Sequence, residues 1–335
     1  MQNRLGTPCL GVLAIAISLS MNGCASSIAT KTSQAGLALI GTSLNAWDDD
    51  KPRKESLELE GLAVEGRHVV AWFPRKVATK ADSANSFSTP KPPLSDADRR
   101  AIVDRLDRGI AEAKRFIGKP DWSFRGDPRL YFYFPDANFI SHAPGGNTAF
   151  ISLWRIRDDQ APWLHEAMHL LMKVDGDWLS QPDGVAEARM PLWLHEGLAE
   201  AISMEVDART GMTHYSPLID VPADQLDAFA AEHLRACPDP QRLLLYVGGR
   251  GKLPELFGED RMKYAAAFYA ASTSFVRHLA RQDGGYQHLL AAIASFDHET
   301  ETYEGLSGQS LDDLKHHWAT EIGLNAATSI RRPSK

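Results

Sequence analysis

The sequence predicts an α+β fold in which a small lobe that contains the strands precedes a mainly α-helical lobe. Residues 129–134 and 148–153 are short apolar runs rich in aromatic and β-branched side chains, which is typical of buried strands. A helical pattern instead covers residues 260–281 in the second half. The chain has 335 residues, of which 44% are hydrophobic, so it can bury the core of a two-lobed domain.

Residues 1–24 have the features of a secretory signal. Arg4 supplies a positive charge, residues 10–19 form an apolar run, and Cys24 closes the segment. The run is too short to span a membrane. Its end resembles a bacterial lipobox, in which Cys24 would carry the lipid; an ordinary signal cleavage nearby is the alternative. Because Ala25 stands where an aspartate would favour retention at the inner membrane, we expect a lipid anchor in the outer membrane, on the periplasmic side of the cell envelope.

Charge and cysteine content exclude other classes. The formal net charge of −7 gives no support for a nucleic-acid partner. Of the three cysteines, Cys9 leaves with the signal and Cys24 would be lipidated, so Cys237 has no partner for an internal disulfide. We therefore expect the core to hold by packing.

The mature chain is expected to have three parts. Residues 25–56 form a tether, residues 57–325 form the domain, and residues 326–335 form a tail. Within the domain, residues 57–175 make up the sheet lobe and residues 176–325 the helical lobe.

Two strands and a long helix begin this domain. Residues 57–60 and 68–73 have strand character. Ser95 can cap a helix over residues 95–117, with Asp98 three residues on and apolar positions repeated along one face. This helix should serve packing.

The segment most informative about chemistry is residues 165–169, which read H-E-A-M-H within a predicted helix over residues 163–174. Two histidines four apart share one face and can hold one zinc ion, while Glu166 between them can reach a metal-bound water. The plain alternative is that His165 and His169 are satisfied histidines in a packed helix. The downstream sequence favours zinc.

Residues 191–200 open a second helix that can complete the ligand set. Two histidines need a third ligand, preferably anionic, with the fourth position left for water. Glu196 can supply it, and Glu200, four residues on, can hydrogen-bond the far nitrogen of a ligating histidine. Asp175, at the spacing that metzincins use, is the alternative third ligand, but Met172 stands where that pattern needs a glycine.

These motifs resemble those of gluzincin metallopeptidases, the clan that includes thermolysin. Residues 193–199 read W-L-H-E-G-L-A, which is similar to the W-L-x-E-G-x-A signature of the third zinc ligand. Residues 269–279 are similar to a later helix whose leading tyrosine stabilises the transition state, and residues 308–318 resemble the closing helix of these domains. The resemblance implies a zincin-like fold with a small mixed sheet, and these roles: one zinc ion held by His165, His169 and Glu196, with Glu166 as general base and Tyr269 as oxyanion donor.

Some positions depart from the family pattern or leave a role open. Residues 145–150 contain no acid where related aminopeptidases anchor the substrate's amine, so aminopeptidase specificity is not implied. His195 should point about 100° away from the ligand glutamate that follows it and not act as a ligand. Tyr264 and His278 are alternatives to Tyr269 for the oxyanion role, because a tyrosine in such a helix is often a core residue.

We therefore expect a zinc-dependent peptidase that acts on peptides or proteins in the cell envelope and is held at the membrane by its lipid anchor. Glu166 would take the proton of the water and pass it to the leaving amine. If residues 148–153 form the edge strand beside the cleft, an extended peptide could pair with them. The alternative is a catalytically idle zinc lipoprotein that acts as an envelope binding or assembly factor; three ligands and the presence of Glu166 favour catalysis.

Overall fold

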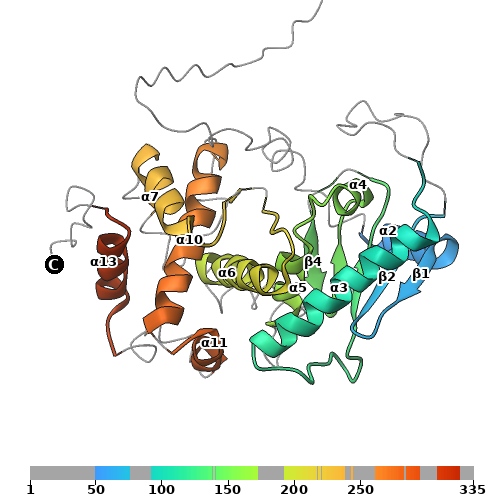
Figure 1. Cartoon of the computed structure of the whole chain (residues 1–335), viewed down its shortest axis with the longest axis horizontal. Helices are drawn as coiled ribbons and strands as arrows, with labels where there is room; N and C mark the ends of the chain where they lie inside the picture. Colours follow the sequence, from blue (N-terminus) through green and yellow to red (C-terminus); the bar gives the residue numbers. More distant parts are fainter. Residues whose placement is uncertain are drawn as a thin grey trace, which may run out of the picture. The chain divides into compact units, whose positions relative to one another are not determined.

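The parts of the chain described by the computed structural model are residues 50–75, 92–137, 139, 141–172, 192–216, 218–219, 221–237, 243, 261–282, 284–294 and 308–324. In these parts the chain forms nine helices and one five-stranded mixed sheet (Figure 1), which is compatible with the predicted α+β class. The expected signal, the tail and most of the expected tether lie outside them. Within the described ranges, no helix is long and apolar enough to cross a membrane.

The sheet has three parallel strands between two antiparallel edge strands. Its order is β1 (Leu62–Glu65), β2 (Val69–Phe73), β3 (Leu130–Tyr133), β5 (Thr148–Phe150) and β4 (His142–Gly145). β3 runs parallel to both β2 and β5, whereas β1 is antiparallel to β2 and β4 is antiparallel to β5. The strands predicted over residues 68–73 and 129–134 are thus confirmed as β2 and β3.

The strand predicted over residues 148–153 is confirmed for residues 148–150, as β5, but its end and its place in the sheet differ from the expectation. Strand β5 ends at Phe150, and a short helix, α4 (Leu153–Arg157), follows it. A short apolar run fits a buried strand and a buried helix equally well, so periodicity did not separate the two. In addition, β5 lies between β3 and β4, so the edge strand on this side of the sheet is β4, which packs against α5 (Trp163–Leu171).

The strand expected over residues 57–60 is also wrong, because these residues belong to helix α2 (Asp50–Glu60). The alternating L-E-L-E pattern suggested a strand, but leucine and glutamate are also strong helix formers. Leu57 is buried while Leu59 is 84% exposed, so only one side of α2 packs on the sheet. Residues 50–56, expected as the end of the tether, are part of the same helix.

Helices cover both faces of the sheet. Alternate residues of a strand point to opposite faces. Ala71 and Phe132 lie in the main core, against which α3 (Asp96–Phe116) packs, whereas Tyr133 lies in a smaller cluster with Leu57 of α2. α3 and α2 therefore pack on opposite faces, and Figure 1 shows the long helix α3 running across the strands.

The long helix predicted over residues 95–117 is confirmed as α3 together with its cap. The Ser95 side chain accepts a hydrogen bond from the backbone N–H of Asp98, and the Asp98 carboxylate accepts one from the backbone N–H of Ser95. This reciprocal pair satisfies two donors at the helix start. Gly118 takes a φ of +75° directly after the last turn, a conformation that side chains with a Cβ rarely adopt.

The helical lobe is built around α6 (Leu192–Thr210) and α10 (Arg261–Gln282). α7 (Leu226–Ala236), α11 (Tyr286–Ala294) and α13 (Leu311–Glu321) pack against α10. α6 also packs against α3 and α5, so it connects the sheet lobe to the helical lobe (Figure 1).

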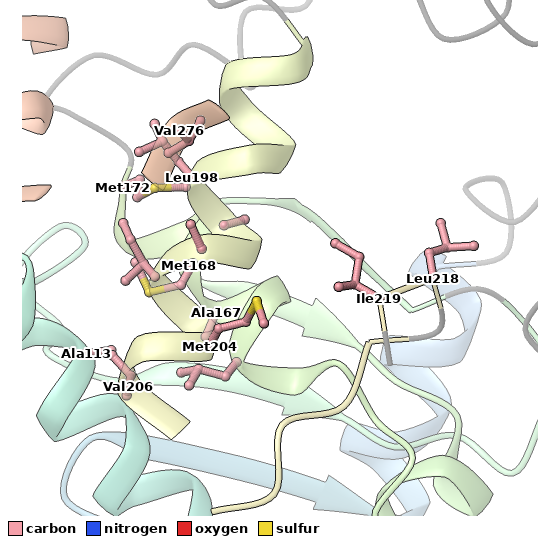
Figure 2. Close-up of a cluster of buried hydrophobic side chains, with 14 of the residues drawn as sticks. Ala113, Ala167, Met168, Met172, Leu198, Met204, Val206, Leu218, Ile219 and Val276 are labelled. Atoms are coloured by element: carbon pink, nitrogen blue, oxygen red, sulfur yellow. The ribbon is translucent and has the colours of Figure 1, made fainter. Parts of the chain in front are cut away.

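Helices α3, α5 and α6 meet in an apolar core. Figure 2 shows Ala167 of α5 beside Met204 of α6, and Ala113 of α3 beside Val206 of α6. All nine residues of α5 are buried, including its three ionisable ones. A helix enclosed on every side must find partners for its polar groups inside the protein. This requirement leads to the candidate site.

Candidate metal centre

Helix α5 brings two imidazole nitrogens together. His165 and His169 are four residues apart and lie on one face of the helix, as the sequence predicts. Their Nε2 atoms are 3.0 Å apart, and the side chains are 9% and 7% exposed as residues. The nitrogens therefore converge at one buried point.

Helix α6 adds a carboxylate at the same point. Oε2 of Glu196 is 3.3 Å from Nε2 of His165 and 3.7 Å from Nε2 of His169. Among the described residues, His165, His169 and Glu196 form the one group of this kind that could hold a metal ion. The structure thus brings together the three predicted ligands. Asp175, the alternative third ligand, lies outside the described residues.

Glu200 occupies the position expected for it behind His165. Its Oε2 is 2.7 Å from Nδ1 of His165, and the glutamate is 2% exposed. A carboxylate can only accept here, so Nδ1 of His165 carries a proton and donates it to Glu200, which fixes the orientation of the ring. Although burial opposes it, the positive charge of His214 and the hydrogen bond from His165 hold the pKa of Glu200 well below its usual value. Glu200 is therefore ionised.

His195 has a partner that the sequence analysis did not foresee. Its ring stacks on that of His169 with a centroid distance of 4.2 Å, and its Nε2 is 3.1 Å from Nδ1 of His169. Because Nδ1 faces away from the converging Nε2 atoms, His195 stands behind a predicted ligand and does not join the group of three. Spacing along the sequence carries no signal for this contact, because His169 lies on α5 and His195 lies on α6, 26 residues further along the chain.

Glu166 is the predicted general base, and its side chain is buried. Burial raises the pKa of Glu166 to about 7, while the charges of His165 and Arg155 act in the opposite direction. A carboxylic acid with a pKa near neutrality can both accept and release a proton at physiological pH. Arg155 on α4 is only 2% exposed, and the sequence analysis had assigned it no role.

Tyr269 of α10 lies close enough to the three predicted ligands for the charge of Glu196 to affect its hydroxyl. Burial, then the negative charge of Glu196, raises the pKa of the Tyr269 hydroxyl well above its usual value, so the hydroxyl stays protonated and can donate. Its alternative His278 has a different partner, since its Nδ1 is 2.6 Å from a carboxylate oxygen of Glu321 on α13. Tyr264 is buried in the main core.

No protein-family model matches the chain, and neither a curated protein nor a solved structure is significantly similar to it. The geometry of the site therefore has to carry the functional argument.

Proposed function

We propose that the protein is a zinc-dependent peptidase of the gluzincin type. The observation that carries this proposal is the convergence of two imidazole nitrogens and one carboxylate oxygen, 3.0 to 3.7 Å apart. Three ligands held tetrahedrally at zinc bond lengths of about 2.0–2.1 Å would be about 3.3 Å from one another. The spacing of His165, His169 and Glu196 therefore fits zinc.

The protonation of the histidines adds a second argument for a cation. Although burial opposes it, hydrogen bonds with Glu196 and Glu200 raise the pKa of His165 well above its usual value, so the two carboxylates favour a positive charge at this point. A cation held by the two Nε2 atoms and Oε2 of Glu196 would supply that charge while both histidines are neutral, as metal ligands must be.

Catalysis is favoured over a structural metal site by what lies around the three ligands. A structural zinc usually has four protein ligands, whereas catalytic sites have three and an open position. The described residues supply three, and His195 is engaged with the far side of His169. Glu166 has no function in merely holding a metal, and burying a carboxylate without such a function costs stability. The alternative, an idle zinc lipoprotein that binds envelope components, explains neither feature.

The residues of the site suit hydrolysis of an amide. Zinc supplies Lewis-acid chemistry, which polarises a carbonyl oxygen and makes water acidic near neutral pH. Glu166, with a pKa of about 7, accepts the proton of the attacking water and hands it to the leaving amine. The Tyr269 hydroxyl donates a hydrogen bond to the oxygen on which negative charge develops.

A peptide is the substrate class that the sheet favours. Strand β4 pairs with β5 on one side and packs against the helix that carries His165 and His169. An extended peptide added to this edge would lie beside the site with little dependence on its sequence. The mixed sheet with an antiparallel edge next to the H-E-x-x-H helix also supports the zincin-like fold. With the predicted signal and a lipid on Cys24, we place the activity in the cell envelope.

Zinc content and turnover of purified variants test this function. The parent should hold about one zinc per chain, which Glu196→Ala should lose. Glu205→Ala, which removes a carboxylate from the same helix outside the group, should keep it. Glu166→Gln should retain zinc but lose turnover of a peptide substrate. A metal-free parent that ignores added zinc would contradict the peptidase, and full turnover in Glu166→Gln would contradict the mechanism.

A further inference from the structure

The hydrogen bonds of the site continue past Glu200 into a second buried pair. The second oxygen of Glu200, Oε1, is 3.0 Å from Nε2 of His214, and Nδ1 of His214 is 2.9 Å from Oδ2 of Asp207. Asp207 is 4% exposed, and the side chain of His214 is 15% exposed. An unbroken chain of hydrogen bonds thus leads from the ligand His165 through Glu200 and His214 to Asp207.

The local fold explains how His214 reaches this position. Glu200 and Asp207 are seven residues apart on α6, about two turns, so they lie on one face of the helix. Gly211 follows the helix with a φ of +66°, and the backbone N–H of Met212 donates to the carbonyl of Asp207. The chain therefore reverses directly after α6 and brings His214 back alongside both carboxylates.

Charge fixes the form of His214. Both ring nitrogens face carboxylate oxygens, so the imidazolium is the form that satisfies both with donated hydrogen bonds. Burial alone would lower the pKa of His214, but the charge of Glu200 and the hydrogen bond to Asp207 outweigh it and raise the pKa to about 9. The positive charge of Arg105 also acts on Asp207 and favours its ionised form. Without His214, Oε1 of Glu200 would lose this partner inside the protein, at a cost in stability.

We infer that His214, held by Asp207, is a positioning residue for the metal group: it orients the Glu200 carboxylate, which in turn orients His165 for metal binding. This inference rests on the proposed zinc function and assigns that site two residues beyond the motif positions. Partners of metal-bound histidines typically change metal affinity by about 10–100-fold when they are removed. His214 lies one hydrogen bond further from the metal site than such a partner, because it contacts Glu200 and not the ligand His165.

A purely structural role would be different. His214 could simply fasten the chain after α6 to the helix, in which case its loss would lower thermal stability and leave metal affinity unchanged. Zinc affinity, measured by competition with a chelator, separates the two roles, and it needs no substrate. A double-mutant cycle with Glu200 shows whether His214 acts through that residue.

The experiment compares His214→Leu, Glu200→Gln and the double variant with the parent protein. His214→Leu should weaken zinc binding by about tenfold or more, but by no more than about twofold in the Glu200→Gln background. His233→Leu is the matched control, because the ring of that histidine on α7 bonds the backbone carbonyl of Phe229 in its own helix. The zinc affinity of this variant should equal that of the parent. Asp207→Asn keeps size and an acceptor oxygen, so it should fold and show a smaller loss.

Distinct results would overturn the inference. Parent-like zinc affinity in folded His214→Leu would do so while leaving the zinc site itself standing. Equal losses with and without Glu200 would show that His214 does not act through it. If His214→Leu does not fold, unchanged affinity in Asp207→Asn decides against the inference. A parent that binds no zinc would overturn both this inference and the proposed function.

Discussion

Replacing Gly197 by alanine should loosen the contact between α6 and α10 and disturb the site with it. A Cβ at Gly197 would lie 2.7 Å from the backbone oxygen of Ser272, 2.8 Å from Cγ2 of Val276 and 2.9 Å from the backbone carbon of Ser272. Ordinary contacts begin at 3.4 Å, so the helices must separate by about 0.7 Å. Rotation of a side chain cannot relieve the closest contact, because it involves the backbone.

Two opposing effects set the magnitude. Alanine is favoured over glycine in a helix interior by about 1 kcal/mol. Overpacking of a core typically costs about 1–3 kcal/mol, and a contact with backbone belongs near the upper end. The free energy of unfolding should therefore fall by about 1–2 kcal/mol. Tyr269 precedes Ser272 by three residues on the same face of α10, so its hydroxyl should move away from Glu196, and a misplacement approaching 1 Å can cost about 100-fold in rate.

Denaturant unfolding of the metal-free protein measures the first effect, and peptide turnover measures the second. The double variant Gly197→Ala/Val276→Ala should not recover the lost stability, because it leaves the contact with the Ser272 carbonyl in place. If Gly197→Ala is as stable as the parent, or if trimming Val276 restores it fully, the reasoning about a backbone contact fails.

Three further predictions concern the groups around the site. Because the folded pKa of His214, about 9, lies above the unfolded value of about 6.5, its stabilisation is complete below pH 6.5 and is lost as the pH rises through 9, by on the order of 3 kcal/mol. His214→Gln should remove this pH dependence in denaturant unfolding between pH 6.5 and 9; an unchanged slope would contradict the assignment. Arg155→Met should raise the pKa of Glu166 further and move the acid limb of the kcat/KM profile to higher pH; a shift to lower pH would show that Arg155 does not act on Glu166. His195→Phe keeps a ring for stacking on His169 but loses the contact with its Nδ1, so zinc affinity should fall about tenfold in chelator competition, and equal affinity would limit His195 to packing.

The three ligands and Glu200 could be predicted because each depends on helical spacing within one segment. Residues four apart on a helix share a face whatever surrounds it, so His165 pairs with His169 and Glu196 with Glu200 before any tertiary contact is known. The pairing of these two helices needed more than spacing, and it followed from the chemistry of a ligand set that two histidines leave incomplete.

The remaining features depend on tertiary contacts that carry no periodic signal. His214 reaches Glu200 only because the chain reverses after α6, and no pattern in residues 211–216 indicates which side of the helix it returns to. Arg155 lies in a short helix that a continuous apolar run concealed. The expectation that residues 148–153 form the edge strand fails for a related reason. The actual edge strand β4, with Pro144 and a glycine, has little strand propensity and is held in place by β5 and α5.

Helix α6 carries a line of buried acidic side chains. Glu196, Glu200 and Asp207 follow one another at spacings of four and seven residues, so a line of acidic side chains runs along a helix that is otherwise packed against α3, α5 and α10. Buried carboxylates destabilise a core unless they are paired. His214 lies between Glu200 and Asp207 and is the partner of both. Although burial opposes it, the charge of His169 and hydrogen bonds with His165 and His195 hold the pKa of Glu196 well below its usual value. The burial of the whole line therefore depends on positive charge beside each carboxylate, and beside Glu196 a metal ion held by His165 and His169 would supply it.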